Sequence, residues 1–424
     1  MKAGESALLS QTGRGTPMGE LLRRYWTPAL LSRELAADGA PVRVRLMGED
    51  LIAFRDSQGR VGLLDQFCSH RGASLYYARN GDSGLRCWYH GWKYDVEGNC
   101  LETPNEPAAS RLHERIRHTA YPCREKNGVV WAYLGPRETM PDMPELEHLL
   151  VPESHHYVSK RHQRCHWTQG MEGDMDPSHI AHLHAAPIAG RQGTPAAQSA
   201  VWVQEGLAPK IEVIHDPARI LFAARRDAGE DGYFWRIAQW FMPFFTTVPA
   251  HSGNGPLFGH AWVPRDDEST WTFTFTWHPQ RPITEEEVQG FLGGNRTHSE
   301  LIPGTFDPVA NKSNEYGRDA PPAPQPWMRI TRIQDQDVAM TEGIGPRFNR
   351  ARENLGSNDH IIARVRANLL DAAAALEQGK EPPRNPKDYR LRPHSARLPR
   401  TVTAWADALA EPLDTRPETY RASA

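Results

Sequence analysis

The sequence predicts an α+β fold built from two domains. Its 424 residues are long for one domain and sufficient for two, and its content of apolar residues permits a large core. Residues 42–46 and 271–277 alternate between apolar and polar side chains with a period of two, which is typical of β-strands, whereas residues 359–376 carry apolar side chains at helical spacing. Strands and helices are therefore both expected.

Residues 1–37 are expected to form a helical segment that packs on the second domain, because Met18, Leu21 and Leu22 follow helical spacing before Pro28 interrupts. Residues 38–150 are expected to form a small all-β domain. It begins with a hairpin whose strands cover 42–46 and 51–54, joined by a turn at 48–50, and it closes with a strand at 129–134. Three prolines between residues 136 and 144 indicate the domain boundary.

Residues 151–424 are expected to form the second domain. In 271–277 the aromatic side chains fall on one face and the threonines on the other, which predicts an antiparallel sheet with one buried face. Residues 359–376 are the clearest helix, ended by Gly379 and Pro382. The tail after residue 383 is rich in arginine and proline and is expected to wrap over the surface.

Composition narrows the classes of function. A net charge of −3 gives no support for nucleic-acid binding. The sequence contains no run of 18 apolar residues, so no membrane span is expected. Residues 1–17 are polar and lack the apolar stretch of a signal peptide, so a cytoplasmic protein is expected. Of the five cysteines, Cys100, Cys123 and Cys165 are expected to be free buried thiols, as in a reducing compartment.

The remaining two cysteines belong to the most informative motif. Cys68-Ser69-His70 is followed, after sixteen residues, by Cys87-Trp88-Tyr89-His90. Each half supplies one sulfur and one imidazole, and two thiolates on one iron with two imidazoles on the other is the Rieske arrangement of a [2Fe-2S] cluster. The alternative is a zinc site, but zinc ligands usually come as a cysteine pair and a histidine pair, and here both halves are mixed.

A second candidate metal site lies between Glu172 and His184. Asp176 precedes Pro177 and is a good helix N-cap, and His179, His182 and His184 follow. A non-haem Fe(II) site needs two histidines and one carboxylate. On a regular helix His179 and His182 share a face, whereas His179 and His184 point about 140° apart unless the helix widens locally into a π-type turn. Spacing alone therefore favours His182 over His184, and unliganded surface or core histidines remain the alternative.

With these motifs in view, the chain resembles the Rieske non-haem iron oxygenases. It is most similar to the group with α-subunits only, which includes phthalate dioxygenase and aromatic-acid O-demethylases such as dehydrodivanillate O-demethylase. The likeness extends over nearly the whole chain, from Gly15-Thr16-Pro17-Met18-Gly19 and Arg24-Tyr25-Trp26, through both cluster motifs, to Asp176-x-x-His179-x4-His184. It implies a Rieske domain and a catalytic domain of helix-grip type, in which an antiparallel sheet wraps around a long helix.

The resemblance also implies roles for single residues. Cys68, His70, Cys87 and His90 become the cluster ligands, and the family pattern makes His179 and His184 iron ligands, with His182 a bystander and the helix widened. The third iron ligand is a downstream Asp followed five residues later by an acid. Asp337 with Glu342 has this spacing, and Asp335 is the alternative. Asp176 matches the bridging carboxylate of the family, which contacts His179 and a cluster histidine, by position His90, of the neighbouring subunit.

The activity that follows from the resemblance is that of a terminal oxygenase. Electrons from NAD(P)H reach it through a separate flavin or iron–sulfur reductase, or a ferredoxin, and pass from the cluster to Fe(II) across a subunit boundary of a homotrimer or stacked trimers. An aromatic substrate, carboxylated and related to phthalate or lignin, is dihydroxylated on the ring or O-demethylated. An arginine suits such a carboxylate, and Arg191, Arg225 and Arg236 are candidates. The alternative function is an electron-transfer protein of Rieske type without oxygenase activity.

Overall fold

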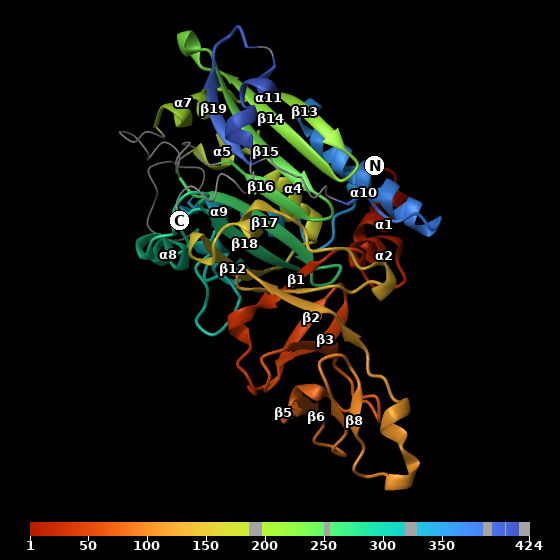
Figure 1. Cartoon of the computed structure of the whole chain (residues 1–424). Helices are drawn as coiled ribbons and strands as arrows, with labels where there is room; N and C mark the ends of the chain where they lie inside the picture. The colour runs from red at the N-terminus through yellow and green to blue at the C-terminus, as the bar shows by residue number, and fades with distance from the viewer. Residues whose placement is uncertain (186–196, 250–254, 319–328, 385–391, 403, 415–424) are drawn as a thin grey trace. The chain divides into compact units, whose positions relative to one another are not determined.

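The computed structural model describes the chain except for residues 186–196, 250–254, 319–328, 385–391, 403 and 415–424. The chain divides into two compact units (Figure 1). The smaller unit contains residues Thr12–Met143 and Pro264–Asp266, and the larger unit contains Met1–Gln11, Pro144–Val263 and Asp267–Ala424. Residues 12–37, expected in a helical segment on the second domain, thus belong to the smaller unit, while residues 1–11 belong to the larger one.

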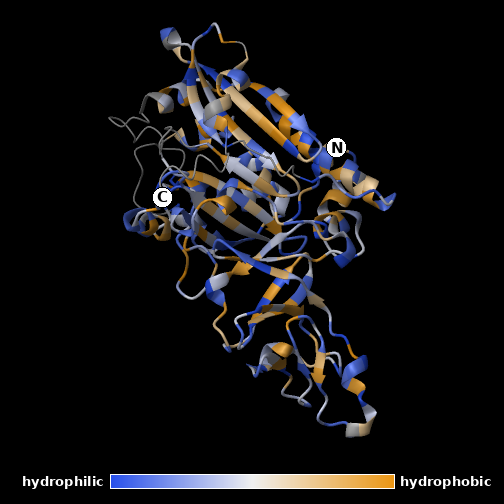
Figure 2. Ribbon diagram, viewed as in Figure 1, coloured by the Kyte–Doolittle hydropathy of each residue, from blue (hydrophilic) through white to orange (hydrophobic). Residues whose placement is uncertain are grey.

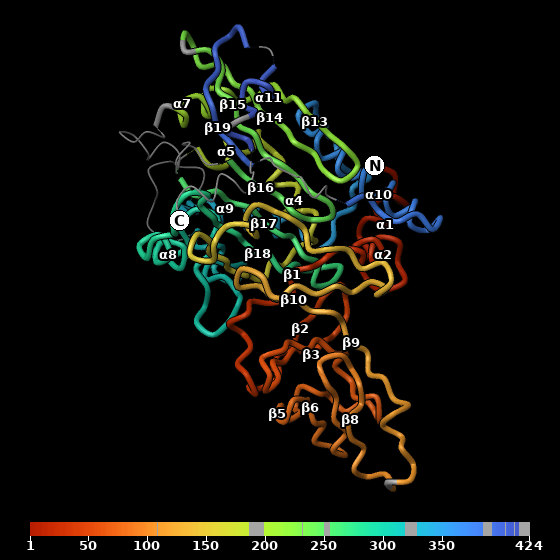
Figure 3. Tube along the Cα trace, viewed as in Figure 1, coloured from red at the N-terminus to blue at the C-terminus, as the bar shows by residue number. Residues whose placement is uncertain are grey.

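The smaller unit consists mainly of short antiparallel strands in three sheets. One sheet has the order β1-β11-β10, the second β2-β3-β4-β9 and the third β5-β6-β7-β8, and Figure 3 shows β5, β6 and β8 side by side. The strands are β1 (Thr27–Leu31), β2 (Val42–Leu46), β3 (Glu49–Arg55), β4 (Val61–Asp65), β5 (Arg79–Gly81), β6 (Gly84–Arg86), β7 (Lys93–Tyr94), β8 (Cys100–Glu102), β9 (Ala120–Tyr121), β10 (Cys123–Lys126) and β11 (Val129–Ala132).

The predicted hairpin of this unit is confirmed. β2 and β3 pair from Val42↔Ala53 to Leu46↔Glu49, so the turn comprises Met47 and Gly48, slightly earlier than expected. Both residues have positive φ, 48° and 81°, as a tight two-residue hairpin requires. The predicted helix is shorter than expected: α2 covers only Pro17–Arg23, capped by Thr16, because the chain then turns into β1.

The larger unit is built on an eight-stranded antiparallel sheet in the order β12-β18-β17-β16-β15-β14-β13, with β19 also paired to β15. Its strands are β12 (His156–Gln163), β13 (Lys210–Asp216), β14 (Arg219–Asp227), β15 (Tyr233–Phe241), β16 (Phe245–Val248), β17 (Leu257–Pro264), β18 (Thr270–Trp277) and β19 (His394–Leu398). Figure 2 shows polar and apolar residues mixed along these strands.

The α-helices of the larger unit are α1 (Ala3–Ser10), α3 (Glu147–Leu150), α4 (Trp167–Asp174), α5 (His179–Leu183), α7 (Ala197–Glu205), α8 (Glu285–Leu292), α9 (Ile333–Gly343), α10 (His360–Glu377), α11 (Trp405–Ala408) and α12 (Ala410–Leu413). α10 confirms the predicted long helix, and its apolar stripe from Ile361 to Ala373 is buried. No helix among the described residues is long and apolar enough to cross a membrane.

Strand β18 differs from the expectation of one buried face. Phe273, Phe275 and Trp277 are buried, but so are all four threonines, each at most 1% exposed. The threonine hydroxyls are satisfied by local partners: Thr270 donates to the carbonyl of Cys165, and Thr276 hydrogen-bonds His298. The polar face of β18 therefore meets hydrogen-bond partners of the protein rather than water, which an alternating pattern alone does not reveal.

The C-terminal tail also differs from its expected place. Part of it, β19, joins the sheet by pairing Tyr233↔Leu398 to Ile237↔His394 with β15. Trp405, Leu409 and Leu413 then pack in a buried cluster with Trp235 and Ile237. The segment thus contributes a strand and core residues instead of only wrapping over the surface.

Candidate metal centres and the cavity beside them

The two halves of the Cys/His motif form loops of the same shape in the smaller unit. In the first loop the amide of Gly72 donates to the carbonyl of Cys68, and in the second the amide of Gly91 donates to the carbonyl of Cys87, both at 2.9 Å. Both glycines have positive φ, 71° and 77°, and a Cβ on Gly91 would lie 2.6 Å from Pro104. Glycine at the end of each motif therefore permits the tight loop.

The loops bring the sulfurs together and the imidazoles together. The thiol of Cys87 hydrogen-bonds the sulfur of Cys68, and this contact lowers the pKa of Cys68 to about 5. The rings of His70 and His90 lie 4.4 Å apart, and His70 stacks on Trp92 at 4.5 Å. The Nδ1 atom of His90 is buried without a hydrogen-bond partner in the described structure. Paired thiols beside paired imidazoles, one with an orphaned buried nitrogen, fit a [2Fe-2S] cluster with two cysteine and two histidine ligands.

The surface around this loop pair is rich in exposed aromatic side chains. Exposure is 66% for Tyr77 and Trp88 and 58% for Tyr89, and Phe67 and Tyr76 are exposed as well. These five residues form the aromatic rim of the loop pair. Large exposed aromatic side chains gathered in one region are typical of a surface that meets another protein.

In the larger unit, His179, His184 and Asp337 form a triad. His179 is the first residue of α5, His184 directly follows its end, and Asp337 lies on α9. Their ligand atoms all lie within 4.8 Å of one another, with Asp337 Oδ1 3.7 Å from His179 Nε2 and 3.1 Å from His184 Nε2. Two histidines and one carboxylate in this arrangement fit a non-haem Fe(II) site with open positions.

The two histidines converge in a way that corrects the expected widened helix. α5 ends at Leu183, and His184 has φ −99° and ψ 14°, outside the helical region. Its side chain direction is therefore not bound to the 100° step per residue of a helix. The predicted N-cap is wrong too: the helix begins at His179, and Asp176 lies before it, where its Oδ1 accepts a hydrogen bond from the amide of Ser178.

Hydrogen bonds determine which nitrogen of each triad histidine carries a proton. His179 Nδ1 lies 2.5 Å from the backbone carbonyl of Asp176, which can only accept. His184 Nδ1 lies 2.8 Å from Gln336 Oε1, and the amide of Gln336 is oriented because its Nε2 donates to the carbonyl of Ile330. Both Nδ1 atoms are therefore protonated, and both Nε2 lone pairs face the carboxylate of Asp337. With both imidazoles neutral, three electron-rich atoms converge on one point, which suits a cation.

The electrostatics of the triad point the same way. Burial disfavours a positive charge on His179, but its hydrogen bond to Asp176 and the charges of Asp337 and Asp176 outweigh burial and raise its pKa. The pKa of Asp176 is lowered although burial acts to raise it, because His179 hydrogen-bonds and attracts its carboxylate. The site therefore favours positive charge at the point where the three ligand atoms meet.

The other sequence candidates lie outside the triad. His182 is exposed and borders the adjoining cavity, and Asp335 is buried elsewhere on α9. Burial raises the pKa of Asp335 to about 6. Glu342, five residues after Asp337, accepts hydrogen bonds from the amide of Arg164 and the hydroxyl of Tyr316, so it anchors α9.

A cavity of about 680 Å³ adjoins the triad. Its walls combine the triad and Asp176 with apolar side chains of the sheet. The further polar groups that line it include the charged side chains of Asp174, Arg236 and Arg296 and the imidazole of His260. Of the arginines expected to face the substrate, Arg236 lines this cavity, Arg225 stacks on Tyr233 at 4.3 Å, and Arg191 lies outside the described residues. Such a volume and lining are typical of a small-molecule site.

Sequence reasoning missed Gln336, Asp174 and His260. Gln336 precedes Asp337 and was recognisable only as part of an acidic and amide-rich helix. His260 alternates with Phe258 and Trp262 along β17, a period that places all three on one face. This alternation can be read from the sequence, but which face of the strand lines the cavity is decided only by how the sheet packs.

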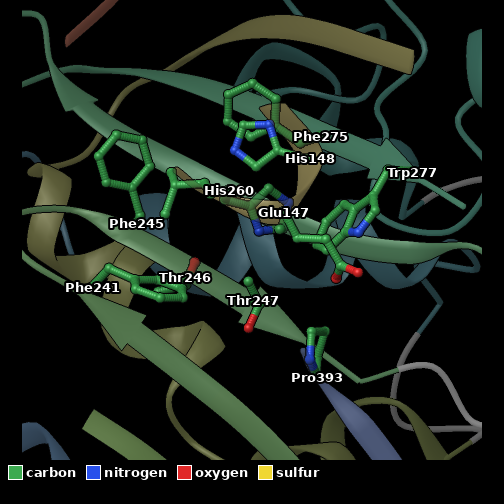
Figure 4. Close-up of a pocket in the computed structure, with 12 residues that line it drawn as sticks. Glu147, His148, Phe241, Phe245, Thr246, Thr247, His260, Phe275, Trp277 and Pro393 are labelled. Carbon is green, nitrogen blue, oxygen red and sulfur yellow. The ribbon is translucent and has the colours of Figure 1, made fainter. Parts of the chain in front are cut away.

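A second, much smaller cavity of about 20 Å³ lies behind this part of the sheet, and Figure 4 shows the side chains around it, with His148 against Phe275. His260 and Thr247 line it, and their buried Nε2 and Oγ1 atoms have no hydrogen-bond partner among the described residues. This volume is about that of one water molecule.

Comparison with known proteins agrees with the two sites. Residues 25–119 match the model of the Rieske [2Fe-2S] domain, and residues 132–396 match the model described as LigXa C-terminal domain like. A Rieske domain followed by a catalytic iron domain defines the class of terminal oxygenases. The chain belongs to the Rieske non-haem iron oxygenases and is similar over most of its length to their oxygenase subunits.

Curated relatives extend over most of the chain. The oxygenase subunit of 3-chlorobenzoate-3,4-dioxygenase from Comamonas testosteroni is 36% identical over 88% of this chain and 89% of its own length. The oxygenase subunit of phthalate 4,5-dioxygenase from Pseudomonas putida is 36% identical over 89% and 87%. The 5,5'-dehydrodivanillate O-demethylase oxygenase subunit of Sphingobium is 30% identical over 90% and 82%.

The fold is also shared with a solved structure. Dicamba monooxygenase bound to dicamba aligns with a TM-score of 0.59 and 19% identity, covering 85% of this chain and 99% of its own. The predicted α+β fold, with an all-β Rieske domain and a helix-grip catalytic domain, is thereby confirmed. The [2Fe-2S] cluster and the mononuclear iron as cofactors are confirmed by the family match together with the His179, His184 and Asp337 triad.

Proposed function

We propose that this chain is the terminal oxygenase that inserts oxygen from O2 into an aromatic carboxylic acid, using electrons that a separate reductase delivers from NAD(P)H. The observation that carries the proposal is the His179, His184 and Asp337 triad beside a cavity of about 680 Å³. When bound, Fe(II) supplies the activation of dioxygen. The protein's own part is to hold the ligands in one tautomer and to present the substrate in a cavity with mostly apolar walls.

Each site residue predicted from the sequence has a role in this proposal. Cys68, His70, Cys87 and His90 hold the cluster, and His179, His184 and Asp337 hold the iron. Asp176 connects the two centres between protomers. The position of Asp176 beside His179 supports this bridging role, because Asp176 Oδ2 lies 3.6 Å from His179 Nδ1.

A homotrimer, alone or stacked, would bring the cluster of one protomer to Asp176 of its neighbour. The aromatic rim around the cluster loops supports this, because exposed side chains such as Trp88 and Tyr89 suit a protein contact better than water. We further propose that the protein acts in the cytoplasm, where the reductase and NAD(P)H are present. The three cysteines outside the cluster site, Cys100, Cys123 and Cys165, form no disulfide, which agrees with a reducing compartment.

The carboxylate of the substrate has a candidate partner. Arg236 is buried in β15 and lines the cavity, where its Nη2 also donates to the carbonyl of Pro249. A guanidinium in a low-dielectric wall favours a carboxylate with two parallel hydrogen bonds. The relatives named for chlorobenzoate and phthalate agree with an aromatic acid.

Two reactions remain open on this site. One is cis-dihydroxylation of the ring, which the similarity to a relative named as a dioxygenase supports. The other is hydroxylation of a methoxy carbon with release of formaldehyde, which the similarity to a relative named as an O-demethylase supports. Which of the two reactions occurs depends on which carbon of the substrate the cavity places beside the iron. A mere electron carrier is disfavoured, because it would have no use for the triad and its cavity.

The test is NADH-dependent oxygen uptake with a surrogate reductase across a set of aromatic acids, with product analysis for diols and formaldehyde. The iron content separates the two classes independently: an oxygenase holds about three irons per chain and an electron carrier about two. A preparation with two irons and no uptake on any aromatic acid contradicts the proposal.

A further inference from the structure

Asp174, the last residue of α4, is held by three donors on a single oxygen. Thr246 Oγ1 lies 2.5 Å, His260 Nδ1 2.7 Å and Trp262 Nε1 3.0 Å from Asp174 Oδ2. Thr246 and His260 are paired residues of β16 and β17, and Trp262 follows on the same face of β17. The sheet therefore determines the position and orientation of this carboxylate.

The second oxygen of Asp174 is left for the cavity. No residue in the described part of the chain donates a hydrogen bond to Oδ1, and the side chain, 14% exposed, lines the same cavity as the iron triad. Burial acts to raise the pKa of Asp174, but the charge and hydrogen bond of His260 and the bonds from Thr246 and Trp262 outweigh it, so the pKa is lowered. An ionised oxygen in a poorly hydrated wall favours a donor and disfavours an anion.

A positively charged group, the guanidinium of Arg236, lines the cavity farther along the sheet. Arg236 lies on β15 four residues before Trp240, the residue that pairs with Thr246. Four residues correspond to about 13 Å along a strand. Between the two polar ends lie Ala238, Val248 and Phe258, which line the cavity with apolar surface. This spacing leaves room for an aromatic ring between a cationic end and an anionic end.

We propose that Asp174 is a specificity residue that accepts, through Oδ1, a hydrogen bond from a hydroxyl or amino group on the substrate ring, so that the enzyme selects aromatic acids carrying such a donor away from the carboxylate. The inference rests on the proposed function for the aromatic acid as substrate class. Repulsion between Asp174 and the substrate carboxylate reinforces the choice of orientation, because the carboxylate is directed to the arginine end.

The experiment measures binding without turnover. The iron-loaded holoenzyme is titrated calorimetrically under anaerobic conditions, without reductase, with matched pairs of acids: 3-hydroxybenzoate against 3-fluorobenzoate, and 4-hydroxybenzoate against 4-fluorobenzoate. Phenol against fluorobenzene forms a neutral pair. The wild type is expected to prefer the hydroxylated member of at least one acid pair by about tenfold to a hundredfold, the effect of a hydrogen bond to a charged acceptor. Asp174→Asn is expected to reduce that preference to within about threefold, because a neutral amide accepts more weakly.

The control is Asp335→Asn, the same chemical change at a buried carboxylate that does not line the cavity, and it should leave the preference intact. Equal affinities within every pair in the wild type overturn the inference without any variant. An Asp174→Asn protein that keeps its iron and its preference also overturns it. One outcome separates the two proposals: if no acid binds, but the wild type prefers phenol over fluorobenzene and Asp174→Asn does not, then aromatic acids are not the substrate class while the role of Asp174 stands. If none of the probes binds, both proposals are contradicted.

Discussion

Gln336 is expected to control how tightly the mononuclear iron is held, although it is not a ligand. Its Oε1 lies 2.8 Å from His184 Nδ1, and both side chains are buried. Replacing Gln336 with leucine keeps a similar volume but leaves the Nδ1–H of His184 without an acceptor. A buried unpaired donor costs about 1–3 kcal/mol. Since about 1.4 kcal/mol corresponds to a factor of ten, we expect iron affinity to fall roughly fivefold to 150-fold.

The assay is competition for Fe(II) with a chromophoric chelator under anaerobic conditions, with the absorbance of the cluster as an internal measure of folding. Gln336→Glu keeps an acceptor for His184 and should retain iron. Gln169→Leu is the matched control: this buried glutamine also contacts α9 and its C-terminal turn, by donating to the carbonyls of Thr341 and Gly345, but it does not touch the triad. Wild-type iron affinity in Gln336→Leu, or an equal loss in Gln169→Leu, refutes the reasoning.

Three further predictions concern the carboxylates. Asp337→Ala should lose the mononuclear iron and keep the colour of the cluster, whereas Asp335→Ala and His182→Ala should keep both. Iron analysis together with the visible spectrum checks this prediction. Loss of iron in Asp335→Ala would show that Asp335, not Asp337, is the ligand. Asp176→Asn should keep both metals, because the backbone carbonyl of Asp176, rather than its side chain, accepts the hydrogen bond from His179 Nδ1 at 2.5 Å. Turnover should nevertheless fall at least a hundredfold. Near-normal turnover excludes the bridging role. The pKa of Asp174 is lower in the folded state, so its contribution to stability is complete above about pH 4 and is lost as the pH falls further. The unfolding free energy of Asp174→Asn should accordingly depend less on pH below about 4 than that of the wild type.

Local sequence was sufficient wherever a short segment decides its own structure. The hairpin of β2 and β3 and the helix α10 follow from hydrophobic period and turn residues within a few positions. The cluster loops are local as well, because each carries two ligands and a closing glycine in five residues. Asp337 was preferred over Asp335 from spacing and family pattern, and the structure places Asp337, not Asp335, with the two histidines.

Only the tertiary structure decided what depends on residues far apart in the chain. His179 and His184 converge because the helix ends between them, and a count of residues per turn assumes that it continues. The threonine face of β18 is buried because other segments supply hydrogen-bond partners, such as the carbonyl of Cys165 for Thr270. Asp174 and His260 are 86 residues apart and meet only through the sheet. Periodicity reports which side chains share a face, whereas what covers that face is determined by long-range packing.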